Sequence, residues 1–148
     1  MSMDLDLADC DDNEKATAAL REWCQQLGYR IEAGKSDISF LLQAERRWVL
    51  SVKAHPDENH RLVATCLFAT HPGYMTKEEW FAFTNRLNVT YNICKFSFDD
   101  DHNFMIVYSL HFLEKISPRL FRNFIAHADR SLMLVFQQEM SVLEEALK

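Results

Sequence analysis

The stretch from residue 76 to residue 112, TKEEWFAFTNRLNVTYNICKFSFDDDHNFMIVYSLHF, decides the fold that this chain predicts. It begins with a helix start, because Thr76 and Glu79 have the capping-box spacing in which each side chain binds a backbone N–H of the first turn. An apolar stripe at helical spacing follows, formed by Trp80, Phe81, Phe83, Thr84 and Leu87. The helix is therefore expected to bury one face against a neighbouring layer.

A hairpin is predicted directly after this helix. Cys94, Phe96 and Phe98 share one face of a strand, and the alternating positions Lys95 and Ser97 share the other. The segment 99–103 is rich in Asp and Asn, which favour turns, and residues 104–112 return as a second strand. The acidic run 99–102 lacks the ligand spacing of a calcium loop, so we interpret it as a solvated turn and not as a metal site.

Two further helices are predicted, one near each end of the chain. Residues 12–27 have helical periodicity, with Asp11 as the cap and Gly28 as the stop. The last helix begins at Pro118 and keeps apolar positions as far as Leu147. An unbroken helix of this length would be longer than a small domain is wide, so we expect a break near residues 127–131 or an end that packs on a partner.

The remaining segments predict strands and complete the fold class. Period-two alternation marks residues 38–43 and 48–54, and shorter or more apolar strands are expected at 29–33 and 61–70. The prediction is an α+β fold with an antiparallel sheet of five to six strands and three helices, in the order α-β-β-β(-β)-α-β-β-α. We expect one domain over residues 1–148, with 1–11 as a flexible acidic tail.

Composition excludes several classes of function. The chain has 148 residues and a net charge of -6, which argues against a nucleic-acid partner because phosphate binding needs clustered Lys and Arg. No apolar run reaches the length of a membrane span, and the acidic N-terminus does not resemble a secretory signal, so a cytoplasmic protein without membrane insertion is expected. The four cysteines lack zinc-site spacing and are expected to be mostly buried thiols.

No pattern in the chain indicates catalysis or a cofactor. A serine-nucleophile elbow, a glycine-rich phosphate loop and a helical metal motif are all missing from the sequence. His55, His60 and His71 fall in or beside loops, where exposed histidines are the usual interpretation. The expectation is a protein that is not an enzyme and holds no cofactor or metal.

Apolar residues on the polar sides of the predicted elements are the candidate partner surface. Core burial explains each of them singly, and a surface for a protein partner or a second copy explains them together. Those on strands are Leu41, Val49, Met105 and Val107, and those on the last helix are Phe136, Met140 and Leu143.

The segment EEWFAFTNRLNVTYNICKFSFDDDHNFMIVYSLHF resembles the YbjN-like family, which is described as a family of proposed bacterial sensory transduction regulators. Trp80, Asn85 and Asn88 occupy places comparable to the family's helix phrase, and the early segment LREWCQQLGYRIE looks like its first helix and strand. The turn departs from the family pattern, with Asp-His-Asn in place of Asp-Gly. The resemblance implies the fold of type III secretion chaperones and a domain, often dimeric, that acts by binding protein.

The leading functional hypothesis is therefore a non-enzymatic protein-binding module, chaperone-like or regulatory, that forms a homodimer or buries partner segments on apolar surface. The alternative is a small-ligand sensor with a pocket between sheet and helices, lined by Trp48, Phe68, Trp80 or Phe96.

Overall fold

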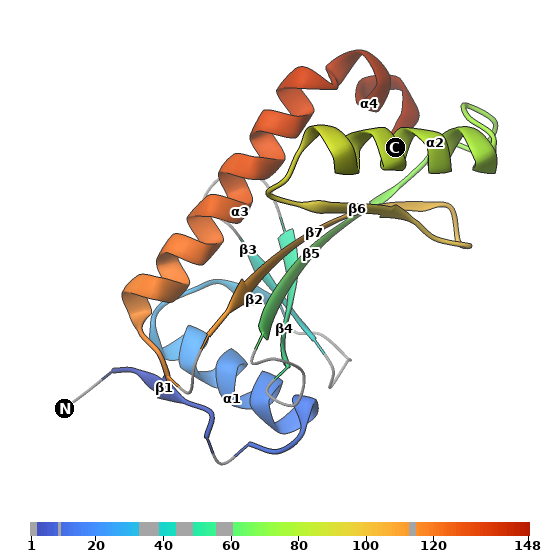
Figure 1. The fold of residues 1–148 in the computed structure, drawn as a ribbon. Helices are drawn as coiled ribbons and strands as arrows, with labels where there is room; N and C mark the ends of the chain where they lie inside the picture. Colours follow the sequence, from blue (N-terminus) through green and yellow to red (C-terminus); the bar gives the residue numbers. More distant parts are fainter. Residues whose placement is uncertain (1–2, 9, 33–38, 44–48, 56–60, 113–114) are drawn as a thin grey trace. The chain divides into compact units, whose positions relative to one another are not determined.

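The computed structural model describes residues 3–8, 10–32, 39–43, 49–55, 61–112 and 115–148. Helices and strands of these residues are shown in Figure 1. In chain order they are β1 (Leu5–Asp6), α1 (Asn13–Gln26), β2 (Ile31–Glu32), β3 (Phe40–Gln43), β4 (Val49–His55), β5 (Arg61–Ala69), α2 (Lys77–Thr90), β6 (Lys95–Phe98), β7 (Asn103–His111), β8 (Lys115–Ile116), α3 (Pro118–Gln138) and α4 (Met140–Ala146).

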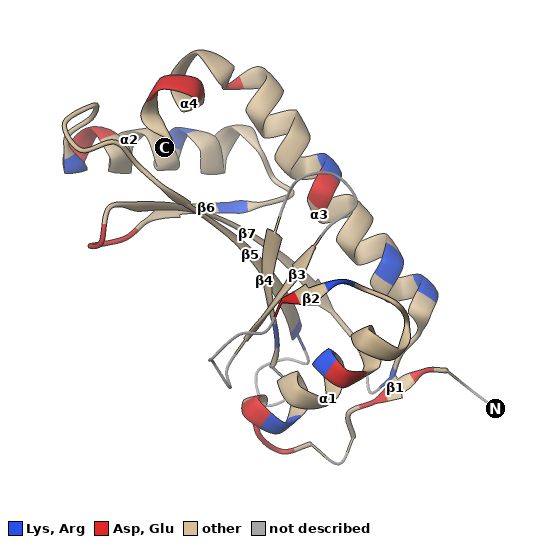
Figure 2. Cartoon of the chain, turned by 180° about the vertical axis from the view of Figure 1, so that it is seen from behind, with Lys and Arg blue, Asp and Glu red and all other residues tan. Residues whose placement is uncertain are grey.

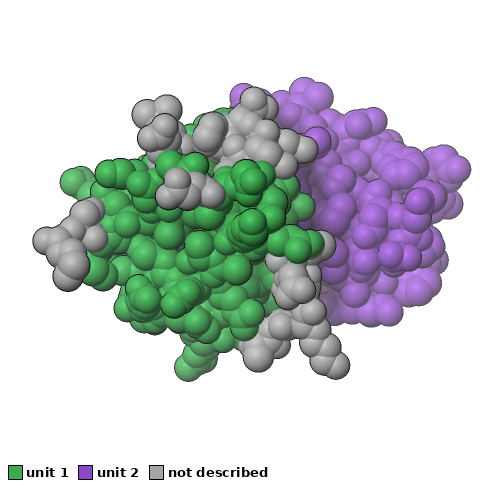
Figure 3. All heavy atoms as spheres, turned by 90° about the horizontal axis from the view of Figure 1, so that it is seen from below, with its two compact units in different colours: residues 1–64, 109–129 green, residues 65–108, 130–148 purple. Residues whose placement is uncertain are grey.

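The main sheet has six strands in the order β2-β3-β4-β5-β7-β6, and β1 pairs with β8 in a small second sheet. The predicted α+β class and antiparallel sheet are confirmed, although the described chain has four helices and not three. The chain divides into two compact units, residues 1–64 with 109–129 and residues 65–108 with 130–148, which Figure 3 colours separately.

In the first unit, α1 is fixed to β4 by a buried side chain. The Thr17 hydroxyl accepts a hydrogen bond of 3.0 Å from the Ala54 backbone N–H. The helix starts one residue later than predicted, because Asp12 and not Asp11 is the cap and accepts from the Lys15 N–H at 2.7 Å. It ends before Gly28, whose φ of +91° is readily adopted only by glycine.

The expectation of a flexible tail is wrong for the described N-terminal residues. Leu5 and Asp6 pair with Ile116 and Lys115 of β8. Leu7 is buried, and the Trp23 indole N–H donates to the Met3 carbonyl at 2.6 Å. The short strand was not predicted, because its two leucines alternate with aspartates and the segment therefore has the acidic composition of a tail.

The second unit contains residues 76–108 of the stretch that decided the predicted fold. Both hydrogen bonds of the predicted capping box are present at the start of α2. The β6–β7 hairpin pairs Lys95 with Val107 and Phe98 with Phe104. Trp80 of α2 is buried and stacks on Phe98 with a ring-centroid distance of 4.9 Å. Figure 1 shows α2 lying along one side of this hairpin.

The last helix breaks at Glu139, so the predicted break at residues 127–131 is wrong. The Glu139 N–H still bonds the Val135 carbonyl, and its own carbonyl accepts from Val142 and Leu143 as α4 begins. No glycine or proline marks this position in the sequence. The side chain of Glu139 instead makes tertiary contacts with Arg86 and Tyr91.

Candidate functional site

One face of the strands in the second unit carries no helix of that unit. On the covered face, α2 and α3 contribute rings that contact the sheet, as Trp80 contacts Phe104 and Phe136 contacts Phe68. Because side chains alternate along a strand, the positions between these rings point to the opposite face. We call this opposite face the open face; its residues are Thr65, Leu67, Ala69, Lys95, Ser97, Met105 and Val107.

The open face is apolar and accessible at its centre. Leu67 is 54% exposed, and Met105 and Val107 are half-buried. Phe68 and Phe104 contact each other on the covered face, with their centroids 6.3 Å apart, which places the neighbouring Leu67 and Met105 close together on the open face. Covering a leucine this exposed with a partner is favourable, because it removes apolar surface from water.

Lys95 contributes the one charge among the open-face residues. The hairpin register places Lys95 opposite Val107 and Ser97 opposite Met105. Figure 2 shows a basic segment on β6 and an acidic turn between β6 and β7; other acidic residues lie on helices and on the short strands β1 and β2. In a chain of net charge -6, this face is therefore apolar with a basic edge.

The predicted partner residues do not form one surface. Met105 and Val107 lie together on the open face. Leu41 and Val49 are half-buried on β3 and β4 of the first unit. The residues of the last helix also separate: Phe136 packs on Phe68, Met140 is 53% exposed, and Leu143 is 1% exposed and belongs to the core.

Sequence reasoning missed Leu67 and Lys95 as members of this surface. A signal for Leu67 was present, because it alternates with Cys66 and Phe68 in a strand that was predicted only as apolar. Lys95 was expected only to lie on the face of its strand opposite Phe96 and Phe98. Only the pairing with Val107 shows that it borders apolar side chains.

A polar cluster ties α2 to the junction of α3 and α4. Arg86 and Glu139 form an ion pair, and the Tyr91 hydroxyl donates to Glu139 Oε2 at 2.7 Å. Burial opposes ionisation of Glu139, but the hydrogen bonds from Arg86 and Tyr91 outweigh it and hold the pKa of the carboxyl below its usual value. Burial and the bond to Glu139 raise the pKa of Tyr91 to about 12. The cluster consists of mutually satisfied groups and acts as a structural connection.

The acidic turn has its carboxylates engaged in the fold. Asp99 Oδ1 accepts from the backbone N–H groups of Asp101 and Asn103, at 2.9 and 2.8 Å. Asp100 forms an ion pair of 2.5 Å with Lys77 at the start of α2. His102 adopts a φ of +61° at the turn. The prediction of a turn at 99–103 is confirmed, and no group of three metal-ligating side chains gathers anywhere in the described chain.

Three of the thiols, those of Cys24, Cys66 and Cys94, are poor nucleophiles. Burial raises the pKa of Cys66 to about 12 and moves the pKa of Cys24 upward as well. Cys94 precedes β6 and is half-buried, so the burial expected for most of the thiols is only partial here. Its surroundings nevertheless raise its pKa to about 11, because burial outweighs the hydrogen bond with Ser131.

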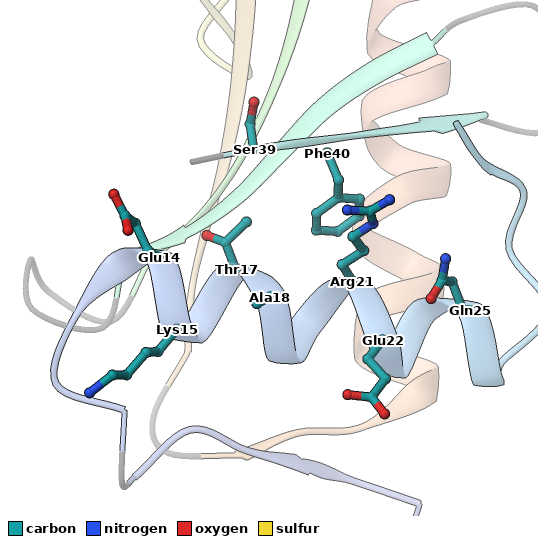
Figure 4. Close-up of a pocket in the computed structure, with 9 residues that line it drawn as sticks. All are labelled: Glu14, Lys15, Thr17, Ala18, Arg21, Glu22, Gln25, Ser39 and Phe40. Carbon is teal, nitrogen blue, oxygen red and sulfur yellow. The ribbon is translucent and has the colours of Figure 1, made fainter. Parts of the chain in front are cut away.

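A hollow in the first unit lies between α1 and β3 (Figure 4). Polar and charged side chains of α1 dominate its lining, which includes Lys15, Arg21 and Gln25, with Phe40 on the strand side. The residues predicted to line a ligand pocket lie elsewhere. Trp80 and Phe96 are buried among other rings of the second unit, and Trp48 lies outside the described residues.

Comparison with known proteins shows the fold of this chain. No protein-family model and no curated protein matches the sequence. The crystal structure of YbjN from E. coli, a proposed transcription regulator, is similar, with a TM-score of 0.64. The matched region covers 89% of this chain and 94% of the YbjN chain. The two chains are 13% identical, so the likeness is one of fold. The fold expected from the resemblance is confirmed at this level.

None of the described helices combines the length and the apolarity that crossing a membrane requires.

Proposed function

We propose that this chain is a non-catalytic protein-binding module and that the open face is its docking surface. The observation that carries the proposal is the exposure of Leu67, at 54%, beside half-buried Met105 and Val107 on a sheet face. The partner is a protein segment with apolar side chains for the centre of the face and a carboxylate for Lys95. A second copy of the chain is the first partner to test.

The chemistry of the face favours a protein over other partners. A nucleic acid needs several cations along its phosphates, and the open face offers Lys95 alone. Covering a leucine and its apolar neighbours contributes roughly 25 cal/mol for each Å² removed from water. Methionine at the centre suits varied partners, because its unbranched side chain adapts its shape.

The comparison is compatible with a regulatory role for such binding. YbjN is a proposed transcription regulator with a similar fold, and fold alone is a weak guide to activity. We therefore rest the proposal on the open face, and we propose a regulatory or chaperone-like role as the class of function that acts through such protein contacts.

Leu67→Asp tests the proposal, because it places a charge at the centre of the open face without disturbing buried groups. Light scattering after size exclusion measures association with a second copy, and cross-linking through the Lys95 amine followed by mass spectrometry maps a partner segment. We expect the variant to lose association and the Lys95 cross-links. Leu134→Asp on α3 is the matched control, because Leu134 is also an exposed leucine of this unit, at 39%. Unchanged association in Leu67→Asp would contradict the proposal.

A further inference from the structure

The outer edge of β6 is occupied by a side chain of α2. β6 is the last strand of the six-stranded sheet, so among the residues that the structure describes no further strand pairs with its outward backbone groups. The Asn88 carboxamide bonds both groups of one residue there: its Oδ1 accepts from the Phe96 N–H at 2.8 Å, and its Nδ2 donates to the Phe96 carbonyl at 2.9 Å. This pair of bonds reproduces what a partner strand would offer.

The hairpin geometry shows that these groups face outward. Asp99 bonds Asn103 across the hairpin through its backbone N–H, so residues at odd positions of this strand direct their backbone groups toward β7. In an antiparallel pair the alternate residues direct theirs to the other side. A four-residue strand then has two outward residues, Phe96 and Phe98. The side chain of Asn88 bonds the outward backbone groups of the first of these, Phe96.

We propose that Asn88 is an edge guard, which keeps β6 from pairing with the β6 strand of a second copy. An uncovered strand edge is a template for association, and proteins protect such edges with side chains or covering helices. Here the helix that covers the hairpin also supplies the side chain. The device concerns the edge of the sheet and is independent of binding at the open face.

The position of α2 keeps the guard in place. The Trp80 ring stacks on Phe98 in the first turn of the helix, and Lys77 binds Asp100 at its start. Asn88 lies in the last turns of α2, at the opposite end from Lys77. The helix is thus held against the hairpin at its start, and at its other end the ring of the C-cap residue Tyr91 contacts the Phe96 ring. The Asn88 carboxamide reaches the Phe96 backbone from this last turn.

Asn88→Ala tests the edge guard. We expect the Phe96 amide to exchange with solvent roughly tenfold faster or more in dilute protein, because its hydrogen bond is lost. At high concentration we expect light scattering to show a larger species than the wild type, with renewed protection of the Phe96 and Phe98 amides. Asn85→Ala is the matched control, since Asn85 is an exposed asparagine one turn earlier on α2.

Two outcomes would overturn the proposal. One is a folded Asn88→Ala variant that keeps both the wild-type mass at every concentration and the wild-type exchange of the Phe96 amide. The other is the same gain of mass in Asn85→Ala. Asn88→Asp keeps the test open where the alanine variant does not fold: it retains an acceptor for the Phe96 N–H, so protection of this amide should persist, and its loss would count against the guard.

Discussion

The two faces of the β6–β7 hairpin have the same strands and the same register but different roles. Phe96, Phe98 and Phe104 point to one face and are buried under α2. Met105 and Val107 point to the other and remain half-buried. The covered face stabilises the second unit, whereas the open face keeps apolar surface that the unit itself does not use. Stability and proposed function are therefore separated by the period-two alternation of a strand.

Removing Trp80 should break the covered face and give the largest effect. Its side chain is 1% exposed and contacts Phe83, Phe98 and Phe104. Trp80→Ala leaves a cavity among these rings and should lower the free energy of unfolding by about 3–5 kcal/mol. Chemical denaturation with fluorescence of the other tryptophans measures this. A loss no greater than that of a surface variant would contradict the assigned core.

Removing the Glu139 side chain should have the next largest effect, through the contacts that hold α2 to the helix junction. Glu139→Ala leaves the partly buried Tyr91 hydroxyl and Arg86 without their common acceptor, which should cost about 2–3 kcal/mol. Thermal unfolding at neutral pH measures the loss. Glu144→Ala on α4 is a control at an exposed glutamate.

The same residue gives a pH dependence of known sign. The pKa of Glu139 is lower in the folded state, so its ionised form stabilises the fold above the usual pKa of glutamate and this stabilisation is lost as the pH falls through the folded value. Glu139→Gln should flatten the acid side of the stability profile relative to the wild type. A stability profile that is equally steep in the variant and the wild type would show that ionisation of Glu139 does not contribute to stability.

Changing the open face should separate binding from stability. Leu67→Asp removes little buried surface, so its effect on the free energy of unfolding should stay within about 0.5 kcal/mol, as at other surface sites. Its effect on association should be large, as proposed above. If the variant loses association only to the extent that it loses stability, the open face has no separate role in binding.

The smallest effect is expected at the tip of the hairpin. Lys77→Ala removes an ion pair with Asp100 in which both side chains are well exposed, at 45% and 91%. Exposed pairs contribute little and are screened by salt. We expect a barely measurable change in melting temperature that vanishes at high ionic strength. A larger loss of melting temperature would show that the ion pair between Lys77 and Asp100 helps to hold α2 on the hairpin.

Local features of this fold could be predicted from the sequence because their causes are local. The capping box of Thr76 and Glu79 depends on residues three positions apart, and the turn of Asp99 and Asn103 depends on side chains that bond their own neighbouring backbone. Alternation along β6 predicted which rings are buried. The break at Glu139 could not be found in this way, because its partners are 48 and 53 residues distant in the chain.

The candidate site was predicted only in part for the same reason. Met105 and Val107 were identified by their position on the polar side of a strand, but Leu67 and Lys95 became part of the surface only through strand order and register. Leu143 had a similar pattern and is in the core, because α4 turns it inward after the break.

The sequence by itself determined the helix–hairpin stretch, the α+β class and the alternation that gives the hairpin two different faces. These follow from periodicity, capping and turn chemistry, which act over a few residues. Only the tertiary structure decided that Asn88 closes the edge of β6 and that Leu67 stands beside Met105. Both depend on elements that meet after folding, and the strength of a hydrogen bond or an apolar contact depends on which groups are brought within reach.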